Sequence, residues 1–288
     1  MKQISSSFSH VNLHQKKTTS VVKDWSKATQ VDEILKSAPF AVTTYDELVR
    51  NVAQIHHRNR NFTLFYRGQS TDHKEDGKTV IMPSIYRKKT GKTKLLLKEN
   101  FKVLEEYSAE LIKKLNDREK KLAGTVMLSK YPEIAWSILQ HYEVCPTPLL
   151  DISHSLHVAC SFAFDRNKGE TGIIYVLGMP YVTDAIGYNS YEELVNIRLL
   201  SVCPPLAHRP FFQEGYLAGP FPNYKLDICG RIKQFDFGRR LIAKFEIPIK
   251  KDFWGAGFTQ IPVDKLYPKD DRVLDICNEI IKSKTKTK

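Results

Sequence analysis

The chain has 288 residues, of which 42% are hydrophobic and 11% aromatic, so it can build a sizeable core and is not disordered throughout. It contains no run of eighteen apolar residues, which argues against a membrane-spanning helix. The formal net charge is +12, from 44 Lys and Arg against 32 Asp and Glu, and this excess favours polyanionic partners through Coulomb attraction.

The N-terminal residues and the cysteines together predict a cytoplasmic protein with reduced thiols. Residues 1–7 lack the apolar stretch of a secretory signal. The five cysteines are odd in number, widely spaced and without a Cys-x-x-Cys pair, so we expect neither a disulfide framework nor a zinc site. They are Cys145, Cys160, Cys203, Cys229 and Cys277.

Much of the positive charge falls in three segments, namely the N-terminal residues, residues 88–98 and residues 282–288. Solvated, flexible segments are the simpler interpretation of such runs. A basic surface for nucleic acid or phosphate is the alternative, and it stays open.

Residues 1–42 are polar and weakly periodic, and we interpret them as an N-terminal arm with one helix near 30–37. The main domain is expected to span 43–280, followed by a basic tail over 281–288. Thr44 and Glu47 have the spacing of a capping box, and the apolar stripe from Leu48 to Ile55 predicts the helix that follows. The run Phe62–Tyr66 then predicts a buried strand.

The rest of the chain divides into segments by the same criteria of periodicity and punctuation. We expect a loop over 70–79, an extended piece over 81–87, helices over 95–115, 132–142, 156–164, 191–196 and 264–281, and strands over 149–153, 171–177, 209–216 and 241–249. Helices gather early and strands late, without regular alternation. This order predicts an α+β fold with a mixed, mostly antiparallel sheet and helices concentrated in the N-terminal half.

Several common site motifs are absent from the sequence. It has no Gly-x-Gly-x-x-Gly, no Walker loop, no Gly-x-Ser-x-Gly elbow and no His-Glu-x-x-His. His154 and His157 flank one turn but have no third ligand nearby, so we expect no metal.

Arg67 follows the predicted strand 62–66 and precedes Gly68 and Gln69. A desolvated arginine needs an anionic partner, and a glycine beside it lets another group approach the backbone closely. A ligand phosphate, which Arg binds bidentately, is one such partner. An internal carboxylate such as Asp151 is the other, and the residues do not decide between them.

A second polar group follows the helix predicted at 132–142. His141 and Tyr142 end that helix, where a histidine is favoured by the helix dipole or contacts a ligand. Asp151 and Ser153 alternate at the end of the next strand, and Ser153 or Ser155 is suited to cap the helix that follows.

A third polar group contains Arg209, Gln213 and Glu214. Glu214 is a candidate general base or a group that orients a substrate hydroxyl. The simpler alternative is an exposed loop acid, which the sequence alone favours.

Taken together, these segments resemble the FRG domain, named for a Phe-Arg-Gly motif. The similarity covers roughly residues 43–280, and its most specific part runs from Gln140-His141-Tyr142 to Leu149-Leu150-Asp151. The other matching pieces are Phe65–Gln69, Pro83–Arg87, Ala159–Ala163, Arg209 with Gln213 and Gly215, and Ile261–Pro268. Because the family is poorly characterised, the resemblance does not by itself assign an activity.

More distantly, the arrangement is similar to the Arg-Ser-Glu class of ADP-ribosyltransferases. The resemblance implies an ADP-ribosyltransferase-like core, with NAD as substrate and Arg67 on its phosphate. Asp151-Ile152-Ser153 stands where that class has Ser-Thr-Ser, and either Gln213 or Glu214 stands where it has a catalytic glutamate. The first serine of that class is an aspartate here, and if Gln213 fills the place of the glutamate, the chain lacks the expected carboxylate.

Two functions therefore remain. The first is an enzyme that transfers ADP-ribose or hydrolyses NAD, with Gln213 or Glu214 as the catalytic residue and Arg67, Gly68, Gln69, His141, Tyr142, Asp151, Ser153 and Arg209 on the ligand. The second is a non-catalytic module that binds a nucleotide or nucleic acid through its basic surface. The resemblance implies a bacterial stress or phage-defence setting for either, with an unknown protein target.

Overall fold

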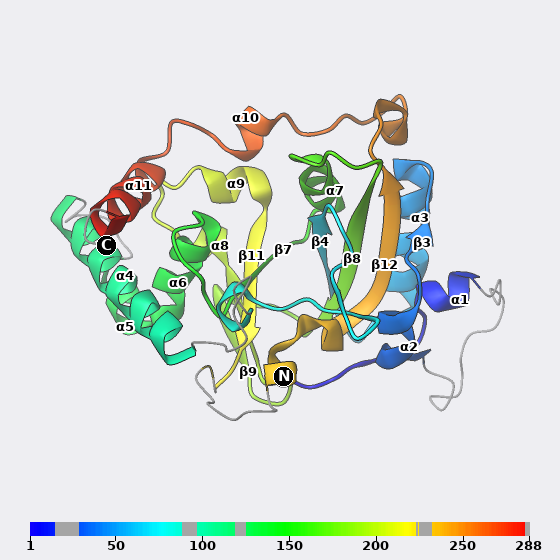
Figure 1. The fold of residues 1–288 in the computed structure, drawn as a ribbon, viewed down its shortest axis with the longest axis horizontal. Helices are drawn as coiled ribbons and strands as arrows, with labels where there is room; N and C mark the ends of the chain where they lie inside the picture. The colour runs from blue at the N-terminus through cyan, green and yellow to red at the C-terminus, as the bar shows by residue number, and fades with distance from the viewer. Residues whose placement is uncertain (15–28, 88–96, 119–124, 223, 225–231, 286–288) are drawn as a thin grey trace. The chain divides into compact units, whose positions relative to one another are not determined.

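The computed structural model describes residues 1–14, 29–87, 97–118, 125–222, 224 and 232–285 (Figure 1). The chain forms two compact units, each built from three stretches. Unit 1 takes residues 1–81, 152–182 and 236–263, and unit 2 takes residues 82–151, 183–235 and 264–288. Cys229 and most of the two basic segments before residue 100 lie outside the described residues.

The elements of unit 1 are β1 (Ser5–Ser6), α1 (His10–His14), β2 (Thr29–Gln30), α2 (Val31–Lys36), β3 (Phe40–Ala41), α3 (Tyr45–Arg58), β4 (Thr63–Gln69), β5 (Lys74–Glu75), β6 (Lys78–Thr79), α7 (Leu156–Phe164), β8 (Thr171–Met179), η4 (Phe237–Arg240), β12 (Leu241–Pro248) and η5 (Lys251–Trp254). Those of unit 2 are η2 (Ser84–Tyr86), α4 (Leu97–Arg118), α5 (Thr125–Lys130), α6 (Pro132–His141), β9 (Ile186–Asn189), β10 (Leu194–Arg198), α8 (Leu199–Val202), α9 (Arg209–Gln213), β11 (Gly215–Pro220), η3 (Ile232–Phe235) and α11 (Arg272–Thr285). β7 (Leu150–Ser153) and α10 (Val263–Leu266) contain residues of both units.

Unit 1 is organised around a sheet with the strand order β3-β12-β8-β4, and Ser153 at the end of β7 pairs with Tyr66 of β4. β3 runs parallel to β12, while the β12–β8, β8–β4 and β4–β7 pairs are antiparallel. Strand β8 is buried from Gly172 to Met179, which suits its central position. The predicted α+β class with a mixed, mostly antiparallel sheet is confirmed.

The segment before residue 43, where it is described, is built into unit 1. Met1, Ile4 and Phe8 are buried, and so are the apolar residues of α2. Asn59, just after α3, binds this segment: its Nδ2 donates to the Phe8 carbonyl oxygen at 2.7 Å, and its Oδ1 accepts from the Ser7 backbone N–H at 2.9 Å. A buried amide that bonds on both sides fixes the path of the chain start.

Most of the predicted elements are present within one to three residues of their expected bounds, namely α2, α3, α4, α6, β7, α7, β8 and β12. Thr44 caps α3 by accepting from the Glu47 backbone N–H, while the Glu47 carboxylate accepts from the Thr43 N–H rather than from that of Thr44. Helices are found in both halves of the chain, and the longest, α4, lies in the first half as expected.

Several predicted segments are wrong or incomplete. The extended piece expected over 81–87 contains the short 3-10 helix η2. The helix expected over 191–196 is a turn followed by β10, because Val195 and Ile197 are buried in an antiparallel hairpin with β9. The strand expected over 209–216 is the short helix α9, and β11 begins only at Gly215. The loop over 70–79 contains the β5–β6 hairpin, in which Asp76 and Gly77 supply the two positive φ angles that a tight hairpin turn needs.

Unit 2 combines helices with the antiparallel strands β9, β10 and β11. Helix α4 lies beside α11, far from it in sequence, and Glu279 of α11 is bonded to Lys114 and Arg118 of α4 (Figure 1). The core includes Phe101, Leu104, Leu111, Trp136, Ile138, Leu139, Val195, Ile197, Leu217 and Ile276. The helix predicted over 264–281 is divided into α10 and α11, and Tyr267-Pro268 lies between them.

None of the helices in the described ranges has the length and apolar character that a membrane crossing requires. Within the same ranges, Cys145, Cys160, Cys203 and Cys277 are free thiols. Burial raises the pKa of the Cys160 thiol well above its ordinary value.

Candidate functional site

Arg67 lies on β4, directly opposite Tyr175 of β8, and Tyr175 in turn lies opposite Lys244 of β12. Directly opposed residues in an antiparallel ladder point to the same face of a sheet. The three side chains therefore form a polar row across three neighbouring strands. Because side chains alternate along a strand, Gln69 shares this face with Arg67.

The opposite face of β4 is covered by α7. A Cβ atom added to Gly68 would lie 1.7 Å from the carbonyl oxygen of Ala159 and 2.9 Å from the backbone nitrogen of Ala163. Both are backbone atoms of a packed helix, so they cannot move aside cheaply. Gly68, predicted as a ligand contact, therefore lies against α7, and its lack of a Cβ atom allows the helix to pack this close to β4.

Arg67 itself is half-buried, whereas the sequence predicted a fully desolvated cation. Its charge acts on the Tyr175 hydroxyl. Burial and the Asp72 carboxylate raise the pKa of Tyr175, and the Arg67 charge opposes that rise. Arg67 is therefore a partly accessible cation that lies opposite Tyr175 in the sheet.

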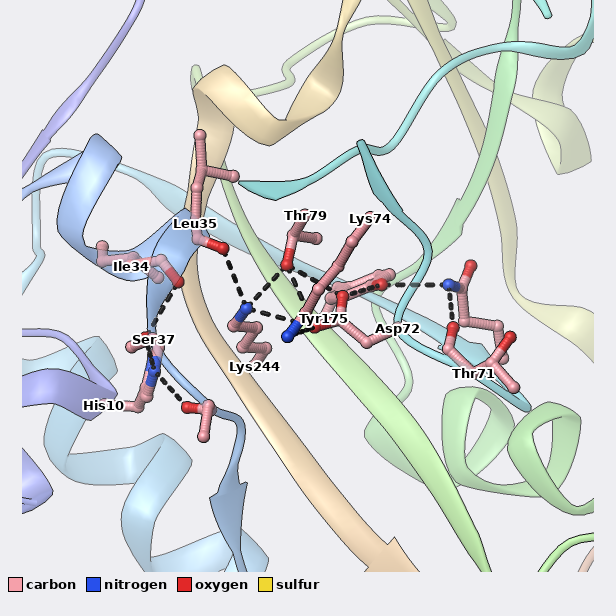
Figure 2. Close-up of polar contacts among 12 residues, drawn as sticks. His10, Ile34, Leu35, Ser37, Thr71, Asp72, Lys74, Thr79, Tyr175 and Lys244 are labelled. Atoms are coloured by element: carbon pink, nitrogen blue, oxygen red, sulfur yellow. Dashed lines mark hydrogen bonds and ion pairs between the residues drawn. The ribbon is translucent and has the colours of Figure 1, made fainter. Parts of the chain in front are cut away.

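Lys244 is fully buried, and each of its three ammonium donors has an acceptor (Figure 2). Its Nζ lies 2.6 Å from Thr79 Oγ1, 3.2 Å from Asp72 Oδ2 and 3.2 Å from the Leu35 carbonyl oxygen. Burial lowers the pKa of Lys244, and the Asp72 carboxylate works against that shift. A buried ammonium is tolerated here because its charge is paired and every donor is satisfied.

Asp72 is the centre of this network. Besides Lys244, its carboxylate accepts from Thr79 Oγ1 at 2.8 Å and from the Tyr175 hydroxyl at 2.8 Å. The Tyr175 oxygen accepts from Gln69 Nε2 at 3.0 Å. A continuous chain of bonds thus runs from the buried lysine through Asp72 to Tyr175 (Figure 2). From Tyr175 it continues to Gln69, a predicted ligand residue.

Ser153 occupies the other face of the sheet from Arg67. It is paired with Tyr66, and opposed residues share a face, so its side chain lies on the side of α7. Ser153 Oγ accepts from the Ser155 backbone N–H at 3.0 Å, and Ser155 caps α7 by accepting from the Val158 N–H. The predicted cap is therefore Ser155, while Ser153 fixes the turn before it.

Unit 2 brings the second predicted group together. Gln140 Nε2 donates to Asp151 Oδ2 at 2.7 Å, and His141 Nδ1 lies 3.5 Å from Asp151 Oδ1. Thr147 Oγ1 donates to Gln140 Oε1 at 2.5 Å. His141 is buried, and its Nε2 has no bonding partner among the described residues. This group combines a half-exposed carboxylate with a buried imidazole that is free at one nitrogen.

Tyr142 and Arg209 are joined by a residue that the sequence analysis did not single out. Asp271 is buried, and its Oδ2 accepts from the Tyr142 hydroxyl at 2.7 Å and from the Arg209 backbone N–H at 3.0 Å. Its Oδ1 accepts from the backbone N–H of Val273 and Leu274, which caps α11. An aspartate directly before an apolar helix is a sequence signal for such a cap.

Arg209, which is only 8% exposed, lies at the C-terminal end of α6. Its Nη1 donates to the His141 carbonyl oxygen at 2.8 Å, and its charge lies over the Tyr142 and Tyr267 rings at 5.6 and 4.5 Å. An arginine so arranged satisfies a helix C-terminus and packs as a cation on aromatic rings.

Gln213 and Glu214, the two catalytic candidates, differ in their surroundings. Gln213 is buried, and its Nε2 donates to the Leu266 carbonyl oxygen at 2.7 Å. Glu214 is exposed and ends α9 with a left-handed φ of 42°. Of the two, Glu214 alone presents a carboxylate to solvent.

Lys244, Asp72 and Tyr175 were also missed by sequence analysis. A signal existed for two of them, since Lys244 interrupts the apolar run from Leu241 to Phe245 in β12 and Tyr175 lies within the apolar run of β8. Asp72 had none, because it follows a strand in an ordinary polar stretch. Across the described ranges, no three His, Cys, Asp or Glu side chains are placed to hold a metal ion.

Comparison with known families finds that residues 63–171 match the model of the FRG domain. Searches of curated proteins and of solved structures gave no match. The matched segment carries Arg67, Gln69, Asp72, His141 and Asp151 and ends before Arg209, Glu214 and Lys244.

Proposed function

We propose that this protein binds NAD or a related nucleotide and holds a phosphate of that ligand at Arg67, as the more distant resemblance to ADP-ribosyltransferases implies. The segment that matches the FRG domain, residues 63–171, includes Arg67. The observation that carries the proposal is the state of Arg67. It is a half-buried cation on a sheet face that also carries Lys244, which is paired with Asp72, and Glu246, which lies two residues from Lys244 on β12. An arginine fork in such a place suits a phosphate better than a lysine would.

As an enzyme, the protein would be an ADP-ribosyltransferase or an NAD glycohydrolase, as the more distant resemblance implies. In that reaction the bond from ribose C1′ to the nicotinamide nitrogen breaks, and nicotinamide leaves with the electron pair. Water or an acceptor side chain bonds to C1′ and loses a proton. Glu214 is the candidate carboxylate for the cationic, oxocarbenium-like transition state, because it is exposed and Gln213 is neutral. Glu214 belongs to unit 2 and Arg67 to unit 1, so its catalytic role is proposed independently of the phosphate contact at Arg67.

The binding step is tested by calorimetry with NAD on the wild type, Arg67→Ala and Arg50→Ala. Arg50 is a matched control, since it is an exposed arginine of α3 whose partner is Asp46 in the adjacent turn. We expect Arg67→Ala to weaken binding by about tenfold or more, as the loss of a charged hydrogen bond implies, and Arg50→Ala to bind like the wild type. A wild type that binds no NAD at millimolar concentration would refute the proposal.

The chemical step is tested separately, by nicotinamide release measured chromatographically. We expect Glu214→Gln to retain NAD binding and to lose release. Binding without release in the wild type would leave a nucleotide-binding module rather than an enzyme. A role in bacterial stress or phage defence belongs to the same proposal and rests on the resemblance alone.

A further inference from the structure

The orientation of the Gln69 side chain amide can be deduced from its neighbours. Its Nε2 lies 2.5 Å from the Thr71 carbonyl oxygen and 3.0 Å from the Tyr175 hydroxyl oxygen. A carbonyl oxygen is only an acceptor, so the atom that faces it must be the NH₂ group. The amide of an asparagine or glutamine can otherwise be assigned either way, and this contact removes the ambiguity.

The Tyr175 contact gives the same answer independently. The Tyr175 hydroxyl has one proton, and the Asp72 carboxylate accepts it at 2.8 Å. The Tyr175 oxygen can then only accept, so Gln69 must donate to it.

Both N–H groups of Gln69 are therefore bonded within the protein, and neither bond uses Oε1. Gln69 is half-exposed and lies two residues from Arg67 on the same face of β4, a spacing of roughly 7 Å along a strand. The face thus carries a cationic donor fork and, at that distance, a hydrogen-bond acceptor.

We propose that Asp72 and Tyr175 are positioning residues that fix Gln69 as an acceptor, so that the site selects a ribose phosphate over inorganic phosphates. An anion at Arg67 would be matched by a hydroxyl that donates to Gln69 Oε1. A ribose phosphate has both groups on one molecule, whereas pyrophosphate has the anion without the donor once the pH is alkaline enough to remove its last proton, and the two are compared at such a pH. The inference rests on the proposed phosphate contact at Arg67 and adds the class of ligand.

The test measures the dissociation constants of ribose 5-phosphate and of inorganic pyrophosphate by calorimetry, on the same preparations. The wild type is expected to prefer ribose 5-phosphate. Tyr175→Phe removes the acceptor that orients Gln69, and Gln69→Met removes the acceptor that faces the ligand. Gln69→Met is expected to reduce the preference about tenfold, and Tyr175→Phe, which keeps the Thr71 contact, by a smaller factor. In both variants the cause is weaker ribose 5-phosphate binding, with pyrophosphate binding unchanged.

Tyr66→Phe is the matched control, because it makes the same chemical change one residue before Arg67 on the opposite face of β4. It should keep the wild-type preference. Arg67→Ala should lose both probes. If Tyr175→Phe fails to fold, Gln69→Met alone decides, since residue 69 is half-exposed and tolerates an uncharged chain of similar length.

The outcomes separate the two proposals. Loss of both probes in Arg67→Ala, with an unchanged preference in Tyr175→Phe and Gln69→Met, would overturn the role of Gln69 and leave the phosphate contact standing. Wild-type binding of both probes by Arg67→Ala, or no binding by the wild type, would overturn both.

Discussion

At the scale of single residues, the stability of unit 1 is most sensitive to mutation at the ion pair between Lys244 and Asp72. Lys244→Met leaves the Asp72 carboxylate, only 9% exposed, without its buried counter-charge. Such a change typically costs about 3–5 kcal/mol. We expect that loss in urea unfolding of Lys244→Met.

The double variant Lys244→Met with Asp72→Asn should recover a large part of the loss, because no uncompensated charge then remains in the core. Asp72→Ser is unsuitable as the partner change, since it would also shorten the side chain that reaches Thr79. If the double variant loses as much stability as the two single variants together, these residues are not a coupled pair.

His10 makes the stability of unit 1 sensitive to acid. Burial, followed by the nearby Lys244 charge, lowers the pKa of His10 to about 3 from its ordinary value of 6.5. Its Nε2 is bonded to Ser37 Oγ at 2.6 Å (Figure 2). Between these two pH values, residue 10 binds a proton in the unfolded chain but not in the folded chain. The contribution of His10 to the free energy of unfolding is therefore fully present above pH 6.5 and is lost as the pH is lowered towards 3.

This difference in pKa corresponds to a loss of about 5 kcal/mol in the free energy of unfolding at the acid end of that range. It is measured by urea unfolding at several pH values in the wild type and in His10→Gln. Since glutamine does not titrate, this variant should lose less stability between pH 6.5 and 4 than the wild type loses. Parallel pH profiles would show that other groups are responsible.

At the scale of elements, the packing of α7 on β4 depends on the bare Cα of Gly68. Gly68→Ala would place Cβ 1.7 Å from the Ala159 carbonyl oxygen, and only a shift of the helix or the strand can relieve that contact. We expect a loss of about 3 kcal/mol or more, since overpacking against backbone is among the costlier core changes.

Gly187→Ala is the control for this change. The nearest atom that its Cβ would meet is the Asn196 carbonyl oxygen at 4.0 Å, an ordinary contact. Thermal unfolding of the two variants should separate them clearly. Equal melting temperatures would mean that α7 is not held against β4 as tightly as this contact implies.

In the elements that sequence analysis predicted correctly, the pattern of apolar residues along the chain matches the pattern of buried residues. The stripe Leu48, Val52, Ile55 of α3 and the apolar run of β8 are of this kind. The errors at 191–196 and 209–216 have the opposite cause. There, four- and five-residue elements follow one another, and tertiary packing decides between helix and strand where too few residues exist to set a period.

At the scale of the whole molecule, the +12 charge and the Arg67 site predict different responses to salt. A nucleotide held at one or two phosphates should lose little affinity between 50 and 200 mM salt. A nucleic acid bound through six or more phosphate contacts would lose about a thousandfold over the same range. Titrations of NAD and of a labelled duplex at both salt concentrations distinguish the two functions.

A steep salt dependence for the duplex, unaffected by Arg67→Ala, would favour the nucleic-acid module. Salt-independent NAD binding that Arg67→Ala removes would favour the nucleotide site. Strong binding of both ligands, each abolished by Arg67→Ala, would contradict the view that the general charge and the site act separately.

The sequence by itself determined the fold class, the main helices and strands, and the polar segments worth examining, because hydrophobic period, caps and strand-end residues are local properties of the chain. Only the tertiary structure decided what those segments do. In the tertiary structure, Asp72 is bonded to Lys244, 172 residues away in the chain, and Ser153 lies on the opposite face of the sheet from Arg67. Arg209 and Tyr142 donate to Asp271, the residue that caps α11. These choices depend on strand register and on the pairing of buried charges, which act between residues far apart in sequence and leave no local pattern.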